Sequence, residues 1–144
     1  MTVDHSAFML QALEVSKQAL PECRPNPPVG CVIVRGGQVV ATGYTQSPGH
    51  AHAEIDAMSK LTGSLEHCTL YVTLEPCSFH GRTPACALKL IERGVKKVYV
   101  AMLDPHVKNQ GKGIELLRAA EVEVQVGLEQ SEVEKYLKPY LLSV

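Results

Sequence analysis

Four residues near the middle of the chain have the types and spacing that a catalytic zinc site needs. His52 stands two positions before Glu54, and Cys77 and Cys86 follow. Imidazole and thiolate groups are preferred zinc ligands, and three protein ligands leave the fourth tetrahedral position for water. The carboxylate of Glu54 would lie beside that water, where it can move protons as a general acid and base. The pattern therefore predicts one zinc ion per chain, bound by His52, Cys77 and Cys86, with Glu54 as the catalytic residue.

The spacing of His52 and Glu54 restricts where they can lie on a helix. Side chains at positions i and i+2 do not share a face in the middle of a helix, so both can reach one spot only at its first turn. Cys86 is expected in a first turn as well, because Thr83 can cap a helix whose first residue is Pro84. The positive end of a helix favours the thiolate, which is the form of cysteine that binds metal.

Two less specific interpretations of these residues stay open. A structural zinc site would need a fourth ligand, and His50 and His80 are close enough in sequence to supply one. Alternatively, the two cysteines could be ordinary buried thiols. Cys31 and Cys68 fit that second description, since both fall in runs with strand character. His5 has no partner visible in the sequence and is expected at the surface.

Alternating helix and strand patterns surround these residues. Apolar spacing, β-branched runs and the positions of glycine and proline predict helices over residues 4–20, 51–61, 84–93, 113–120 and 130–141. The same signals predict strands over residues 29–35, 38–44, 68–74, 97–103 and 122–126, the first two joined as a hairpin at Gly36-Gly37. This order predicts an α/β fold with a mixed, mostly five-stranded sheet, helices on both faces and a ligand site in the loops at the strand ends.

Composition is typical of an ordinary globular domain. A chain of 144 residues suits one domain, residues 1–144, and no linker-like stretch divides it. The sequence has neither an apolar run of membrane-spanning length nor a signal-peptide pattern at its start, so a cytoplasmic location is expected. Five cysteines are too few for a secreted disulfide framework and favour reduced thiols or metal ligands. The net charge of −1, with scattered lysines and arginines, argues against a nucleic-acid partner.

The chain resembles one branch of the zinc deaminases. Their general signature is His-x-Glu followed by Pro-Cys-x-x-Cys. This chain has His52-Ala53-Glu54 and Pro76-Cys77, but eight residues, 78–85, separate Cys77 from Cys86. That long spacing is similar to the deaminase domain of the riboflavin-pathway pyrimidine deaminases. The similarity extends along nearly the whole chain, through Pro25-Asn26-Pro27, Val29-Gly30, residues 72–78 and 80–84, Ala101-Met102, Asp104-Pro105, Gly111 and Gly113.

The resemblance implies both a fold and a reaction. The fold would be the cytidine-deaminase-like three-layer α/β/α sandwich. The reaction would be hydrolysis of an amino group on a pyrimidine nucleotide, with diaminohydroxyphosphoribosylaminopyrimidine as the substrate. The resemblance also implies a homo-oligomer, a dimer or larger. A single deaminase domain is expected, without the reductase domain that the family often carries.

The first three candidates for substrate binding follow from the same resemblance. The family places the asparagine at position 26 against its substrate, which makes Asn26 a candidate. Thr45 occupies the place where the family usually has a histidine that lines the substrate site. His106, followed by Val107, stands where the family usually has Asn-Pro.

Three further candidates come from their positions in the chain. His80 and Arg82 lie in the loop between the metal ligands, where they could contact substrate or simply bind the loop's own backbone. Lys112 stands between two glycines at a predicted helix start, so it could bind a phosphate together with the exposed amides. An ordinary helix start explains the same residues equally well.

Several functional alternatives remain. Thr45, His106 and Val107 leave open the same chemistry on another base, nucleoside or specialised heterocycle. Editing of tRNA or single-stranded DNA is disfavoured, because the chain has only two phenylalanines and five tyrosines and no basic stripe. A nucleotide-binding module without turnover would be expected to have lost a ligand or the acid/base residue, and the sequence keeps all four.

Overall fold

The computed structural model describes residues 4–78 and 85–141. In these ranges the helices are α1 (His5–Ser16), α2 (Ala53–Met58), α3 (Cys86–Glu92), α4 (Lys112–Ala119) and α5 (Gln130–Leu141), and a 3-10 turn, η1 (Lys17–Ala19), follows α1. The strands are β1 (Gly30–Arg35), β2 (Gln38–Tyr44), β3 (Cys68–Val72), β4 (Lys97–Val100) and β5 (Glu123–Val126). All the predicted elements are present, and most are shorter than predicted. No helix within the described ranges is long and apolar enough to cross a membrane.

The strands form one mixed sheet in the order β2-β1-β3-β4-β5. β1 runs antiparallel to both β2 and β3, whereas β3, β4 and β5 are mutually parallel. The β1–β2 hairpin turns at Gly36 and Gly37, whose positive φ angles of 59° and 78° suit the tight turn of a two-residue hairpin loop. The predicted mixed five-stranded sheet is therefore confirmed, and β3 is the strand at which pairing changes from antiparallel to parallel.

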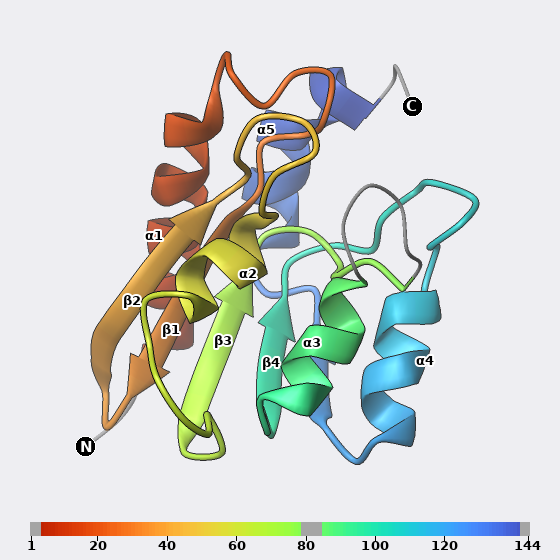
Figure 1. The fold of residues 1–144 in the computed structure, drawn as a ribbon. Coiled ribbons are helices and arrows are strands. Elements are labelled where there is room, and N and C mark those ends of the chain that lie inside the picture. The colour runs from red at the N-terminus through yellow and green to blue at the C-terminus, as the bar shows by residue number, and fades with distance from the viewer. Residues whose placement is uncertain (1–3, 79–84, 142–144) are drawn as a thin grey trace.

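Helices cover both faces of the sheet and make three layers. In Figure 1, α2, α3 and α4 lie in front of the sheet, and α1 and α5 lie behind it. Successive side chains of β1 point to opposite faces of the sheet. Cys31 and Ile33 pack with the front helices, whereas Val32 and Val34 pack with the rear ones. Cys68 is also buried in the front core, so the prediction that Cys31 and Cys68 are core thiols is confirmed.

Of the four helices whose limits differ from the prediction, α2 and α3 show the local reason most clearly. α2 ends at Met58 because the guanidinium of Arg93 donates hydrogen bonds to the carbonyl oxygens of Met58, Leu61 and Gly63, at 3.0–3.1 Å. These bonds satisfy groups that a longer helix would have paired internally. α3 begins at Cys86, with Ala85 at the cap position in a non-helical conformation. The predicted first helical residue, Pro84, and the predicted cap, Thr83, lie outside the described residues.

The N-terminus of α1 is attached to the sheet by an aromatic cluster. His5 is half-buried, with Nδ1 2.6 Å from the hydroxyl oxygen of Tyr71 and Nε2 3.2 Å from that of Tyr99. The two tyrosine rings stack with their centroids 5.0 Å apart. Burial raises the pKa of Tyr71 to about 12. The expectation that His5 is a surface residue was therefore wrong, because its partners lie on β3 and β4, far away in the sequence.

Candidate metal centre and active site

The start of α2 brings His52 and Glu54 together. His52 is the residue before the helix, with extended backbone angles (φ −75°, ψ 170°), and Glu54 is the second residue of the helix. Because the chain changes direction at this point, positions i and i+2 can face one site, as the spacing predicted. Glu54 is almost fully buried, with 4% of its surface exposed.

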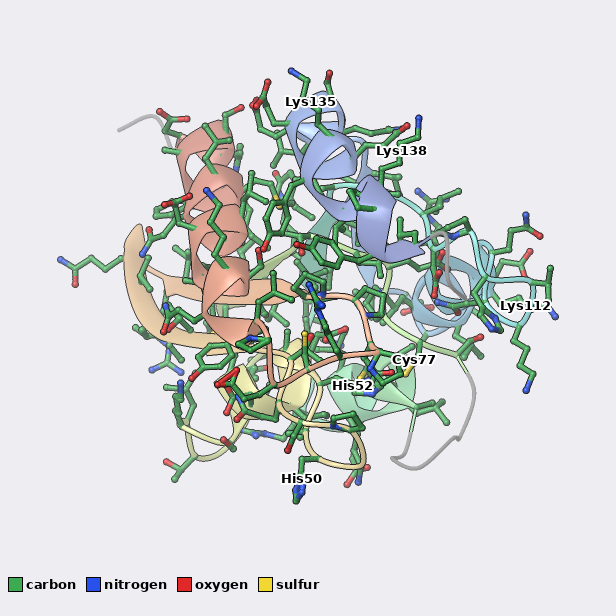
Figure 2. The ribbon with its side chains drawn as sticks, turned by 90° about the horizontal axis from the view of Figure 1, so that it is seen from above. His50, His52, Cys77, Lys112, Lys135 and Lys138 are labelled. Atoms are coloured by element: carbon green, nitrogen blue, oxygen red, sulfur yellow. The ribbon has the colours of Figure 1, made fainter. Side chains whose placement is uncertain are left out.

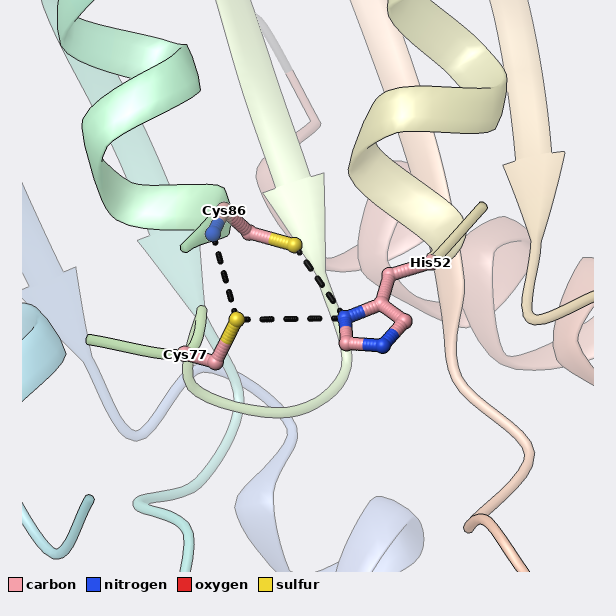
Figure 3. Close-up of side chains that lie close together, drawn as sticks. All are labelled: His52, Cys77 and Cys86. Atoms are coloured by element: carbon pink, nitrogen blue, oxygen red, sulfur yellow. Dashed lines mark hydrogen bonds between the residues drawn. The ribbon is translucent and has the colours of Figure 1, made fainter. Parts of the chain in front are cut away.

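Two further segments bring the cysteines to the same place. Cys77 follows the end of β3, and Cys86 is the first residue of α3. Figure 3 shows both sulfur atoms facing the ring of His52: Sγ of Cys86 is 3.3 Å from Nδ1, and Sγ of Cys77 is 3.8 Å from it. The backbone N–H of Cys86 donates a hydrogen bond to Sγ of Cys77 at 3.1 Å.

The three side chains fit a zinc ion. Their ligand atoms all lie within 4.8 Å of one another. Zinc bonds of about 2.3 Å to sulfur and about 2.0 Å to nitrogen would put tetrahedral ligand atoms roughly 3.5 Å apart, close to the spacings found here. Among the described residues no other histidine, cysteine or carboxylate joins this group. His50 is exposed and points away from the centre in Figure 2, so it does not complete a structural site.

The pKa values of the ionisable groups in the site are shifted in different directions. Hydrogen bonding from Cys86, and then from His52, lowers the pKa of Cys77 to about 4 against the opposing effect of burial. The pKa of Cys86 is raised by the same pairing and by burial. The hydrogen bond to Cys77 raises the pKa of His52. Burial raises the pKa of Glu54 to about 7, and the nearby Cys77 thiolate adds to the rise. Cys77 is thus prepared as a thiolate ligand, and Glu54 can both accept and release a proton near neutral pH.

A cavity of about 260 Å³ opens beside these residues. His52, Glu54 and Cys77 line it, and the remaining lining residues are Asn26, Pro27, Val29, Thr45, Leu74, Glu75, Asp104 and His106. Three of the predicted substrate-binding residues, Asn26, Thr45 and His106, therefore lie on the walls of the cavity that contains the metal ligands, although they come from three separate loops.

Hydrogen bonds within the protein orient two of these wall residues. The hydroxyl of Thr45 accepts a hydrogen bond from the backbone N–H of Val29 at 3.0 Å, which links the start of β1 to the end of β2. Nδ1 of His106 accepts one from the backbone N–H of Lys108 at 3.1 Å. Both side chains are therefore held in place before any ligand enters.

Lys112, another predicted substrate-binding residue, does not line the described cavity. Lys112 is exposed, is not among the lining residues, and lies at the periphery in Figure 2, away from His52 and Cys77. The amides beside it are occupied, because the carboxylate of Glu75 accepts hydrogen bonds from the N–H groups of Gly111 and Gly113. His80 and Arg82 lie outside the described residues.

No role in the site was predicted for several residues that surround it. Glu75, Asp104 and Leu74 line the cavity, and Asn109 is fully buried beside Cys77. One signal was available for Glu75: a carboxylate directly after a buried strand, next to a metal ligand, has to find hydrogen-bond donors. No comparable signal marks Asn109, which lies in a polar run between a strand and a helix.

Comparison with known proteins agrees with this geometry. Residues 2–102 match the family described as the cytidine and deoxycytidylate deaminase zinc-binding region. The riboflavin biosynthesis protein RibD of Actinobacillus pleuropneumoniae is 48% identical over 87% of this chain and 33% of its own length. The diaminohydroxyphosphoribosylamino-pyrimidine deaminase of Buchnera aphidicola is 39% identical over 92% of this chain and 90% of its own length.

The solved structures agree as well. The structure of Acinetobacter baumannii RibD superposes with a TM-score of 0.91 at 40% identity, covering 96% of this chain and 39% of the other. The chain thus spans about a third of the length of the RibD proteins it matches and nearly all of the Buchnera deaminase. The predicted cytidine-deaminase-like fold is confirmed. Together the metal ligands, the buried glutamate and these similarities show that the chain belongs to the zinc-binding cytidine and deoxycytidylate deaminase family, in its riboflavin-biosynthesis branch.

Proposed function

We propose that this enzyme removes an amino group by hydrolysis from diaminohydroxyphosphoribosylaminopyrimidine, the compound in the name of its Buchnera relative. The observation that carries the proposal is the placement of Glu54. Its buried carboxylate shares a cavity with His52 and Cys77, and that cavity is walled by residues able to bind a heterocycle. Its volume, about 260 Å³, suits one ring with small substituents.

The chemistry assigns a distinct task to each group. His52, Cys77 and Cys86 would hold zinc, which when bound lowers the pKa of water toward neutrality. Glu54 accepts the first proton of the attacking water and gives it to the ring nitrogen next to the reacting carbon. It then accepts the second proton, from the hydroxyl group formed on that carbon, and gives it to the departing amino group. One water is consumed and one ammonia is released for each ring. A pKa of about 7 suits Glu54 to both halves of this transfer.

Recognition of the ring is assigned to the cavity walls. The side-chain amide of Asn26 offers both a donor and an acceptor, which matches the mixed hydrogen-bonding edge of a pyrimidine. Thr45 and His106 would shape other parts of the wall. His80 and Arg82 stay predictions for substrate contacts, and Lys112 stays a prediction for the phosphate.

A second candidate keeps the chemistry and changes the substrate. It is favoured by Thr45 and His106, which line the cavity where the resembling family usually has histidine and asparagine. Side chains of other size and hydrogen-bonding character at these two points would fit another small heterocycle. Turnover of a free base or nucleoside, with none of the riboflavin intermediate, would select this candidate.

The test measures ammonia release from the riboflavin intermediate by the zinc-loaded enzyme. Glu54→Gln should lower kcat by roughly 10²–10⁴-fold, because general acid–base catalysis contributes about that much. Zinc content should stay at one per chain, since Glu54 is not a ligand. Glu115→Gln, an exposed carboxylate in the first turn of α4, is the matched control and should be fully active. Undiminished release by the Glu54 variant would refute its assigned role.

The cellular setting is part of the same proposal. A site with two cysteine ligands needs reduced thiols, and all five cysteines are free in the structure, which supports a cytoplasmic location. The homo-oligomer implied by the resemblance remains a prediction, which light scattering of the purified protein would check.

A further inference from the structure

One buried carboxylate binds the segment that forms a wall of the cavity. Glu75, 4% exposed, follows β3 and accepts four backbone hydrogen bonds. Oε1 accepts from the N–H groups of Asp104 at 3.0 Å and Gly111 at 2.9 Å. Oε2 accepts from those of Gly113 at 2.9 Å and Ile114 at 3.2 Å. One side chain thus fixes both ends of the segment 104–113, which includes the first two residues of α4.

A second buried side chain binds this segment to the metal ligand itself. Asn109 is fully buried, and its Oδ1 accepts a hydrogen bond from the N–H of Ser78 at 3.1 Å. Its Nδ2 donates to the carbonyl oxygen of Pro76 at 3.2 Å. Those two groups belong to the peptide bonds on either side of Cys77. Asn109 therefore fixes the backbone of a zinc ligand from both directions.

The same amide reaches the cavity wall. Nδ2 of Asn109 lies 3.4 Å from Oδ2 of Asp104, and the other carboxylate oxygen of Asp104 accepts the backbone N–H of His106 at 3.0 Å. Asp104 and His106 both line the cavity. The contact is also tight, because a methyl group at Gly113 would overlap the carbonyl oxygen of Pro76. Gly113 therefore packs directly against the peptide that precedes Cys77.

We propose that Glu75 and Asn109 are positioning residues, which together fix Cys77 as a metal ligand and hold Asp104 and His106 on the cavity wall. Neither side chain is a metal ligand, and both act through backbone groups. Partners of this kind around a metal site typically contribute about 10–100-fold to metal affinity or activity. The metal half of the proposal needs only the zinc centre, whereas the substrate half rests on the proposed function.

The first experiment measures zinc release to a colorimetric chelator under native conditions. Asn109→Ala removes both hydrogen bonds to the peptides around Cys77, and zinc should leave at least ten-fold faster than from the unaltered enzyme. Asn109→Asp keeps an acceptor for Ser78 but turns an oxygen toward the carbonyl oxygen of Pro76 and the carboxylate of Asp104, so zinc should leave at least as fast as from Asn109→Ala. Should Asn109→Ala fail to fold, Asn109→Ser, which retains a small hydrogen-bonding group, takes its place.

The second experiment separates binding from chemistry. Glu75→Gln replaces one acceptor oxygen by an amide NH₂ that faces backbone N–H groups, which loosens one end of segment 104–113. At saturating zinc, KM for the pyrimidine should rise about ten-fold while kcat changes little, because Glu54 and the ligands are intact. Glu75→Asp, which keeps the charge but has a shorter reach, should recover part of the loss.

The matched control is Arg93→Met. Arg93 also binds a loop through three backbone groups, but at the far end of α3 from Cys86. It should lower thermal stability as the test variants do and leave zinc release and KM unchanged. If zinc release and KM change in proportion to the loss of thermal stability in every variant, including Arg93→Met, the proposal is overturned. An enzyme inactive on the pyrimidine would remove the substrate half alone, since zinc release needs no substrate.

Discussion

At the scale of single residues, the site places two acidic groups in one buried space and moves their pKa values in opposite directions. N–H and S–H donors around Cys77 stabilise its thiolate and bring its pKa to about 4. For Glu54 burial is the largest effect, and it raises the pKa to about 7. A carboxyl group in this range is half-protonated at neutral pH, which is the condition a proton shuttle requires.

Cys77→Ser gives a residue-scale prediction. Serine is a poor zinc ligand, and its hydroxyl cannot replace the thiolate that the surrounding donors stabilise. Zinc content after gel filtration, measured by elemental analysis, should fall far below one per chain, and ammonia release should be lost. Cys68→Ala, which removes a buried thiol from β3, should keep its zinc. Stoichiometric zinc in the Cys77 variant would show that another group supplies the third ligand.

The residues that sequence could and could not reveal differ in how they act. That His52, Glu54 and the two cysteines lie at one site could be predicted, because side-chain type and spacing indicate it. Glu75 and Asn109 act on backbone N–H and C=O groups, which every residue offers, so their roles depend on which segments the fold brings together. For the same reason the amides beside Lys112 looked available for a phosphate, although Glu75 occupies them.

At the scale of elements, the site depends on how closely α2 approaches β2. A methyl group at Gly43 would overlap the backbone of α2 at Ala53 and Ala57. Only a residue without a side chain lets the helix pack this near, and the start of that helix presents His52 and Glu54 to the cavity. The hydrogen bond from the N–H of Tyr44 to the carboxylate of Asp56, at 3.1 Å, holds the same contact together.

Gly43→Ala should therefore disturb the metal centre from a distance. The added methyl group has to push α2 away from the strand, at a cost of about 1–3 kcal/mol in the free energy of unfolding, typical of overpacked cores. Zinc affinity should fall with it, because His52 moves with the helix. Chelator competition and thermal unfolding measure the two effects. The control is Val40→Ala, at a half-exposed position on the same strand, which should change zinc affinity and thermal stability little. If Gly43→Ala has wild-type zinc affinity and thermal stability, α2 does not need the close approach.

Element types were easier to predict than element ends. Hydrophobic spacing and β-branched runs gave the right order of helices and strands, because they report which face is buried. Ends depend on tertiary contacts: α2 ends at Met58 where Arg93, more than thirty residues away, takes the carbonyl groups. Strand order could not be read from the chain either, since β3 pairs with β1 rather than with its sequence neighbour β2.

At the scale of the whole molecule, the zinc ligands join parts of the fold that are distant in sequence. His52 belongs to the start of α2, Cys77 to the end of β3 and Cys86 to the start of α3. A bound ion would therefore connect these segments and stabilise the native state over the unfolded chain. The layer formed by α1 and α5 packs on the opposite face of the sheet. A bound ion would therefore stabilise this layer only through the sheet itself.

Removal of zinc should lower the thermal midpoint of the entire domain. A ligand at about 1,000 times its Kd stabilises by about 4 kcal/mol, which for a domain of this size corresponds to roughly 10 °C. Differential scanning fluorimetry with and without a chelator would measure the shift, and added zinc should reverse it. The Cys77→Ser protein should show no response to the chelator. An equal response there would place the stabilising ion elsewhere in the molecule.

The four hydrogen bonds to Glu75 also bear on how the enzyme is made. Residues 52–86 leave the ribosome before residues 113 and 114 do. All three ligands are therefore available while the later part of the chain is still being made. Gly113 and Ile114, which bind Glu75 from α4, emerge later. Until Gly113 and Ile114 have been made, Glu75 lacks two of its hydrogen bonds and the turn at Cys77 is less firmly held. The order of synthesis therefore delays the formation of a rigid metal site. We therefore expect the nascent chain to acquire its metal late, after the front layer of helices has closed over the sheet.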